Sequence, residues 1–148
     1  MTVTVATWTE SRHQKHITAS CAGDAGTELD LEVERRSDAT TEILTLDAQL
    51  RTKDWVFIGD GRPMLLLVDS TRLTLPAVGR PWRKADAGWV HEGSRYLSAA
   101  SQLRQIANAN AVSVRLTGSE GQCDFDLPVG SRATISQFLA HEYGSRSP

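Results

Sequence analysis

Acidic and apolar residues alternate strictly from Glu28 to Glu34, in the order Glu-Leu-Asp-Leu-Glu-Val-Glu. Successive side chains leave a β-strand on opposite sides, so a period of two predicts a strand with one buried and one solvated face. The same period returns between residues 43 and 50, where one face carries Leu44, Leu46, Ala48 and Leu50. These patterns indicate a β-rich chain.

The first 75 residues are predicted to form a succession of antiparallel strands at 2–8, 15–21, 28–34, 43–50, 64–68 and 72–75. Polar connections are expected at 24–26, 35–38 and 69–70, and the turn at 59–63 contains Asp-Gly, which suits a tight hairpin. The segment Met64–Val68 is entirely apolar. It is therefore predicted to be a central strand buried on both faces, with Leu65 and Leu67, or their immediate neighbours, fully buried.

Residues 76–93 show no period of either kind and are interpreted as an exposed, irregular loop, with prolines and a glycine at its start and Gly88 near its end. After this loop the period becomes helical. A helix capped by Ser98 is expected to bury Leu103 and Ile106, and a last helix capped by Ser131 is expected to bury Ile135, Phe138, Leu139 and Tyr143 on one face. Strands at 112–116 and 123–127 lie between the two helices.

The predicted fold is a mainly β single domain over residues 1–144, followed by a tail at 145–148. We expect an antiparallel β-sandwich or a strongly curved sheet with two short helices in the C-terminal third. The alternative is an α+β arrangement with both helices on one face of an antiparallel sheet. The succession of elements from residue 97 to 139 is similar to the ends of various bacterial β-rich domains, a similarity that implies no particular site.

The charge is unevenly distributed along the chain. Residues 1–50 hold nine acids and four bases (a charge of -5), residues 51–95 hold eight bases and five acids (+3), and residues 96–148 hold four of each. The net charge of -2 argues against a general nucleic-acid binder, which needs a clearly basic surface. The longest apolar run is far shorter than the roughly 20 residues of a membrane-spanning helix.

No signal peptide is visible, which predicts a cytoplasmic protein; a processed fragment of an exported precursor is the alternative. The cysteines, Cys21 and Cys123, are 102 positions apart. We expect two thiols in preference to a disulfide.

No combination of residues predicts catalysis, a cofactor or a metal. His13 and His16 are interpreted as part of a solvated polar turn, because the residues around them lack the helical period that would place two zinc ligands on one face. His91 and His141 each lack a second histidine at helical spacing, and Cys21 near His16 is weak support for a nucleophile. The carboxylates of 28–34 are expected to be solvated, since positions two apart on one strand are about 7 Å apart.

The segment 80–89 supplies the candidate binding residues, which combine bases with large aromatic side chains: Arg80, Trp82, Arg83, Lys84 and Trp89. Tryptophan and arginine dominate the energetics of protein interfaces. The sequence therefore predicts a non-catalytic binding or protein-interaction module; it does not identify the partner, for which another protein is the candidate. The alternatives are a small enzyme with a scattered site and a small-molecule carrier with a cavity between sheet and helices.

Overall fold

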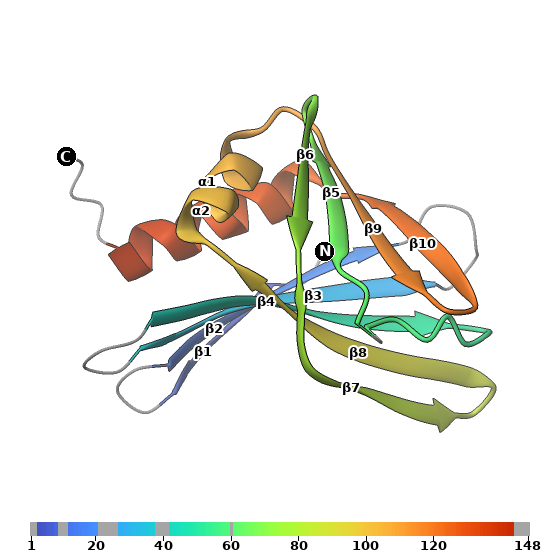
Figure 1. Ribbon diagram of the computed structural model, residues 1–148. Coiled ribbons are helices and arrows are strands. Elements are labelled where there is room, and N and C mark those ends of the chain that lie inside the picture. Colours follow the sequence, from blue (N-terminus) through green and yellow to red (C-terminus); the bar gives the residue numbers. More distant parts are fainter. Residues whose placement is uncertain (1–2, 9–11, 21–26, 38–41, 60, 144–148) are drawn as a thin grey trace.

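The structure is a computed structural model that describes residues 3–8, 12–20, 27–37, 42–59 and 61–143, with the backbone alone in the first two ranges and at residues 36, 37 and 42. Within this part of the chain, antiparallel strands form two sheets and two helices lie near the C-terminal end (Figure 1).

The larger sheet has six strands in the order β1-β2-β3-β4-β8-β7. Their bounds are β1 Val3–Trp8, β2 Arg12–Ser20, β3 Glu28–Ser37, β4 Glu42–Thr52, β7 Ala77–Asp86 and β8 Trp89–Ser98. The smaller sheet has four strands in the order β10-β9-β5-β6. Their bounds are β5 Met64–Val68, β6 Thr71–Leu75, β9 Val112–Gly118 and β10 Gly121–Asp126, and the helices are α1 Ala100–Asn108 and α2 Val129–Tyr143.

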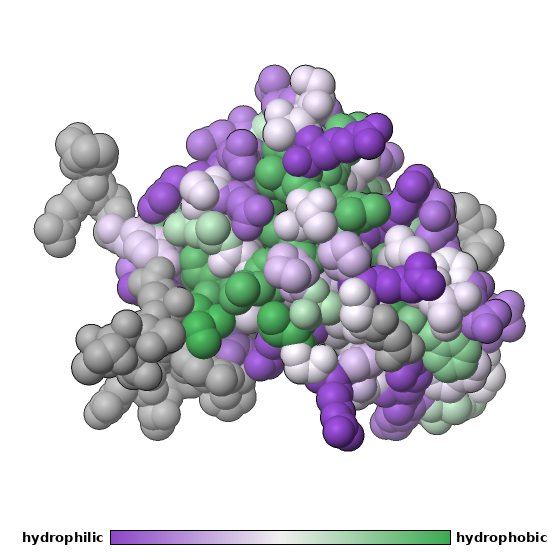
Figure 2. All heavy atoms as spheres, in the orientation of Figure 1, coloured by the Kyte–Doolittle hydropathy of each residue, from purple (hydrophilic) through white to green (hydrophobic). Residues whose placement is uncertain are grey.

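The hydrophobic core lies between one face of the six-stranded sheet and a layer made of the four-stranded sheet and both helices (Figure 1). We call this face of each sheet inner and the opposite face outer. The four-stranded sheet crosses the larger one, because β10 contacts β2 and β6 contacts β8, while α2 packs on β2 and β3. In the view of Figure 2, apolar side chains reach the surface in a band between the helices and the six-stranded sheet.

The predicted fold class is confirmed: the chain is mainly β and antiparallel, with two helices in its C-terminal part, and the sheets are not closed. The alternation in β3 and β4 is also confirmed, since Leu29, Leu31 and Val33 are buried and face the buried leucines of β4 across the ladder. The predicted turn at 24–26 and the tail at 145–148 lie outside the described residues.

The hairpin predicted at 59–63 is wrong. Strand β4 lies in the larger sheet and β5 in the smaller one. The connection between them therefore crosses from one sheet to the other, and we call its described residues, 53–59 and 61–63, the crossing segment. The turn chemistry itself is present, because Gly59 and Gly61 have φ angles of 84° and 74°. A local turn signal does not determine which strands pair. Here β4 pairs with β3 and β8, and β5 belongs to the other sheet.

The prediction that β5 is buried on both faces is also wrong. The strand is central in its sheet, but only Met64, Leu66 and Val68 are buried. Leu65 and Leu67 are 38% and 45% exposed, because their outer face has no layer above it among the described residues. An unbroken apolar run therefore belongs here to a strand with one solvated face.

The irregular loop predicted at 76–93 is a β-hairpin. Strands β7 and β8 pair from Asp86↔Trp89 onward, and the two turn residues Ala87 and Gly88 have φ angles of 49° and 84°, as in a type I′ turn. Strand β7 is an edge strand with both faces largely exposed and a register shift between Val78 and Trp82, around Pro81. These features remove the alternation on which sequence-based assignment depends.

Several predicted boundaries move. Ser98 ends β8, and α1 begins after Ala99, whose backbone N–H donates to the Gln102 side chain (2.9 Å). Ser131 lies within α2, which starts at Val129, so neither serine is the helix cap. Strand β3 continues to Ser37, so the connection predicted from residue 35 starts later. His13 and His16 lie in β2, which corrects the predicted polar turn.

Candidate binding surface

Trp82 lies on the outer face of β7, directly over Gly93 of β8. A Cβ atom built at Gly93 would come within 2.0 Å of the indole Nε1, so only glycine allows the ring this close to the neighbouring strand. The side chain is nevertheless 44% exposed. The indole is thus supported from below by backbone and open to solvent above.

Trp89, at the start of β8, is contacted by two bases, Arg51 of β4 and Lys53 just after that strand. The guanidinium of Arg51 lies 3.7 Å from the ring centroid and the ammonium of Lys53 lies 3.9 Å from it. Both distances are within the range of cation–π attraction. The contacts hold two positive charges beside a half-buried aromatic ring.

The register completes this surface. Lys84 pairs with His91, and His91 pairs with Arg51, so the three positions form one row across β7, β8 and β4. We call the set Arg51, Lys53, Trp82, Lys84, Trp89 and His91 the tryptophan face. The exposed Arg80 lies beside it, in the stretch where the β7–β8 register shifts. Glu28, opposite Arg51, and Asp86, opposite Trp89, border it with negative charge.

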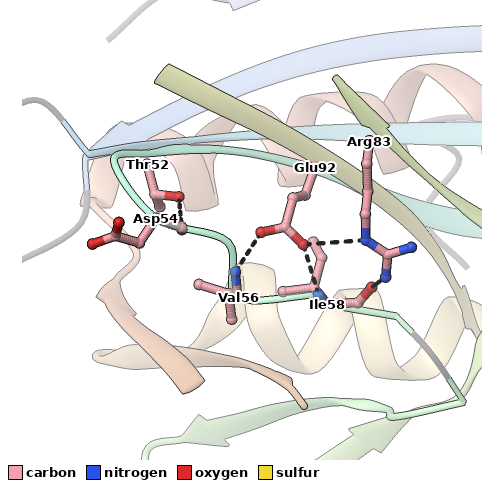
Figure 3. A network of polar contacts seen from close by, with 6 residues as sticks. All are labelled: Thr52, Asp54, Val56, Ile58, Arg83 and Glu92. Carbon is pink, nitrogen blue, oxygen red and sulfur yellow. Dashed lines mark hydrogen bonds and ion pairs between the residues drawn. The ribbon is translucent and has the colours of Figure 1, made fainter. Parts of the chain in front are cut away.

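Arg83 belongs to a different site from the other four sequence candidates. It pairs with the buried Glu92 on the inner face, with Nε of Arg83 lying 3.8 Å from Oε1 of Glu92 (Figure 3). Its guanidinium also donates to the carbonyl of Ile58 (3.3 Å) and lies 5.1 Å from the Phe57 ring centroid. Arg83 therefore connects β7 to the crossing segment.

Glu92 fastens the crossing segment to the six-stranded sheet. Its carboxylate is fully buried and accepts hydrogen bonds from the backbone N–H groups of Val56 (2.7 Å) and Ile58 (2.9 Å) (Figure 3). On the other side, Ile58 bridges to Gly118 at the end of β9. A charged acceptor on two backbone donors is a strong interaction, so Glu92 has a structural role.

A second charged cluster lies on the outer face of β3, β4 and β8. One carboxylate oxygen each of Glu32, Glu34 and Asp47 lies within 4.8 Å of the others. Arg95 binds Asp47 through two hydrogen bonds (3.1 and 3.2 Å) and lies 3.8 Å from Glu34. Glu34 is buried, so this part of the acidic strand is less solvated than expected. The expected absence of a metal stays a prediction.

Burial raises the pKa of the Asp47 carboxyl above its ordinary value of 3.8, and Arg95 lowers it without cancelling that effect. A carboxyl whose pKa is higher in the folded state binds its proton more tightly there, so its contribution to stability falls as the pH rises through the folded pKa. We therefore expect Arg95→Gln to raise the pKa of Asp47 further. Carboxyl chemical shifts measured by NMR against pH in the wild type and in Arg95→Gln test both statements. A wild-type pKa of Asp47 below 3.8 would contradict the effect of burial, and a pKa that Arg95→Gln does not raise would contradict the effect of Arg95.

Among the residues that the structure describes, the groups with shifted pKa do not share one site. Asp47 and Arg95 lie on the outer face of the six-stranded sheet, Tyr96, whose pKa burial raises, lies in the core, and Arg115, whose pKa is raised by its hydrogen bond to Asp124, lies on the smaller sheet. Cys123 is half-buried on β10, and Cys21 lies outside the described residues, so the expectation of two thiols in preference to a disulfide stays a prediction.

Within the described part of the chain, neither helix is long and apolar enough to span a membrane. The sequence matches no protein-family model, and it has no match among curated proteins or solved structures.

Proposed function

We propose that the protein is a non-catalytic interaction module that binds an acidic segment or surface of another protein through the tryptophan face. The observation that carries this proposal is the position of Trp82, a large aromatic ring supported by Gly93 and 44% exposed to solvent. An exposed tryptophan leaves a large apolar surface in contact with water. Binding a partner buries that surface, so the ring becomes an anchor of the interface.

The charges around the two rings support an acidic partner. Arg51 of β4 and Lys84 of β7 place positive charge on either side of His91, and Lys53, which follows β4, adds a third positive charge beside Trp89. Such bases steer an acidic partner and fix its orientation more than they add affinity. The chain as a whole is slightly acidic, which supports a protein partner over general binding to nucleic acid.

The enzyme and carrier functions are the alternatives to this proposal. An enzyme would be expected to gather several groups with shifted pKa in one cavity. The dispersion of Asp47, Tyr96 and Arg115 over three places therefore favours the interaction module. An open groove lies on the outer face of the four-stranded sheet, and neither Trp82 nor Trp89 lines it.

Trp82→Ala should leave thermal stability nearly unchanged and abolish partner binding, because the ring contacts solvent on one side and the backbone of Gly93 on the other. The measurement is affinity capture from cell extract with quantification of each retained protein, together with thermal unfolding of both variants. The matched control is Val129→Ala, since Val129 is an apolar residue that is 71% exposed at the start of α2.

A defined probe complements the capture experiment. A peptide of alternating glutamate and leucine should bind the wild type and quench its tryptophan fluorescence, with an affinity that falls as salt screens the charges. Lys84→Glu should weaken this binding, whereas Val129→Ala should not. A large loss of stability in Trp82→Ala would contradict the proposal. Equal capture by the wild type, Trp82→Ala and Val129→Ala would contradict it as well.

A further inference from the structure

The outer face of the four-stranded sheet holds an open groove of about 660 Å³ that the proposed function does not use. Its floor is formed by Leu65 and Leu67, which are adjacent outward positions of β5 and are 38% and 45% exposed. The two leucines form one continuous apolar patch at the centre of a sheet face, and an apolar patch rimmed by polar residues is a feature of interaction sites.

Polar residues flank the leucines in a fixed order. Two rows cross the face in the strand order β6, β5, β9, β10: Thr74, Leu65, Arg115 and Asp124 in one, and Arg72, Leu67, Ser113 and Asp126 in the other. Arg115 binds Asp124 through two hydrogen bonds (2.8 and 3.1 Å), and the hydroxyl of Ser113 donates to Asp126 (3.1 Å). The β6 edge is thus basic and the β10 edge acidic.

We propose that this groove binds a second copy of the chain, face to face, about a two-fold axis parallel to the strands. The two arginines and two aspartates of the face balance, so a strongly acidic or basic partner gains nothing from it. A second copy fits because this axis places β6 of one subunit over β10 of the other. Arg72 then meets Asp126 of the partner subunit at both ends, and the four leucines lie together at the centre.

The charge pattern also selects this axis over the other face-to-face arrangement. A two-fold axis perpendicular to the strands would place β10 over β10, with Asp124 against Asp126 of the partner subunit. Like charges opposite one another are unfavourable. Both axes leave the strands of the two sheets roughly aligned, as in β-sandwiches, so the charges decide between them.

The interface is small, which sets the expected affinity. Four strands about 4.8 Å apart and about five residues long cover a patch far below the roughly 800 Å² per partner of a standard interface. The dimer should therefore be weak and visible as a concentration-dependent equilibrium between about 1 µM and about 1 mM, the range of weak complexes. Sedimentation equilibrium of the full chain over this range measures it.

A charge exchange tests the arrangement. Arg72→Asp and Asp126→Arg should each weaken association about tenfold or more, and the double variant should restore it, because the exchanged pair meets between subunits. Within one subunit the two residues are three strand spacings apart, roughly 14 Å, so restoration cannot arise inside the monomer. Leu67→Lys should abolish association, while Leu97→Lys, at a similarly exposed leucine on the outer face of the six-stranded sheet, should not change it.

Circular dichroism of each variant verifies that it is folded. A wild type that stays monomeric up to about 1 mM would overturn the proposal, since weak complexes are populated at that concentration. Association that Leu67→Lys leaves unchanged would overturn it as well. A double variant no stronger than either single variant would overturn the two-fold arrangement.

Discussion

Glu92→Ala is expected to lower the free energy of unfolding by about 3–5 kcal/mol, as for other buried charge pairs that lose one partner. The substitution removes the acceptor of the buried N–H of Ile58 and of the part-buried N–H of Val56, and it leaves the Arg83 guanidinium beside a vacated site. An unsatisfied buried donor costs about 1–3 kcal/mol. Urea unfolding followed by circular dichroism measures the loss.

Two further variants distinguish the loss of this buried carboxylate from the loss of an acidic residue in general. Glu92→Gln retains one acceptor oxygen and should cost less than Glu92→Ala. Asp124→Ala removes an exposed carboxylate that is paired with Arg115, and it should leave the free energy of unfolding nearly unchanged. Equal losses in Glu92→Ala and Asp124→Ala would show that the crossing segment does not depend on the buried carboxylate.

Through its hydrogen bonds to the crossing segment, Glu92 also helps to hold the two sheets together. Residues 53–59 form no strand of their own apart from the bridge of Ile58 to Gly118, and they lie between the Glu92 carboxylate and the β9–β10 hairpin. The backbone N–H of Glu120 donates to the carbonyl of Val56 (3.2 Å) and adds a contact to that hairpin. The sheets are therefore tied together by backbone hydrogen bonds as well as by the core.

The parts of the fold that depend on neighbouring residues could be predicted from the sequence. Strands β3 and β4 show the period of two, and the turns at 69–70 and 118–121 join the paired strands β5–β6 and β9–β10. Asp69 adopts a φ of 54°, a conformation that aspartate tolerates better than most residues. Local chemistry of this kind is visible in a single sequence.

The arrangement of strands into two sheets could not be predicted, because it is decided by contacts between distant residues. Strand β8 shows why. Its inner positions include Glu92, Ser94 and Ser98, which are buried although they are polar. The donors that satisfy Glu92 lie 34 and 36 positions earlier in the chain, so nothing near β8 in the sequence indicates that a carboxylate can be buried there.

Only part of the candidate surface could be predicted from the sequence, because the rest also depends on contacts between distant residues. The sequence marks Trp82, Lys84 and Trp89 as aromatic and basic residues close together, but Arg51, Lys53 and His91 join them only through the strand register. The period of two would also have separated Arg83 from Trp82 and Lys84, had 77–86 been recognised as a strand. The bulge and the edge position hid that signal.

Leu66→Ala is expected to lower the free energy of unfolding by about 2–5 kcal/mol, whereas Leu67→Ala should leave it nearly unchanged. The two residues are adjacent in β5 and chemically identical, but Leu66 is buried among Val114 and Leu73 of the neighbouring strands and Leu67 is 45% exposed on the outer face. The pair therefore tests which face of β5 belongs to the core.

Urea unfolding should be measured at a protein concentration of about 1 µM, because self-association through the outer face would add an apparent, concentration-dependent stability to the wild type. Leu65→Ala provides the matched second exposed position and should behave like Leu67→Ala. Equal losses at Leu66 and Leu67 would mean that both faces of β5 are covered, which would contradict an outer groove. A loss confined to Leu66 leaves the outer leucines available for a partner, since they then contribute little to folding and their exposure needs another explanation.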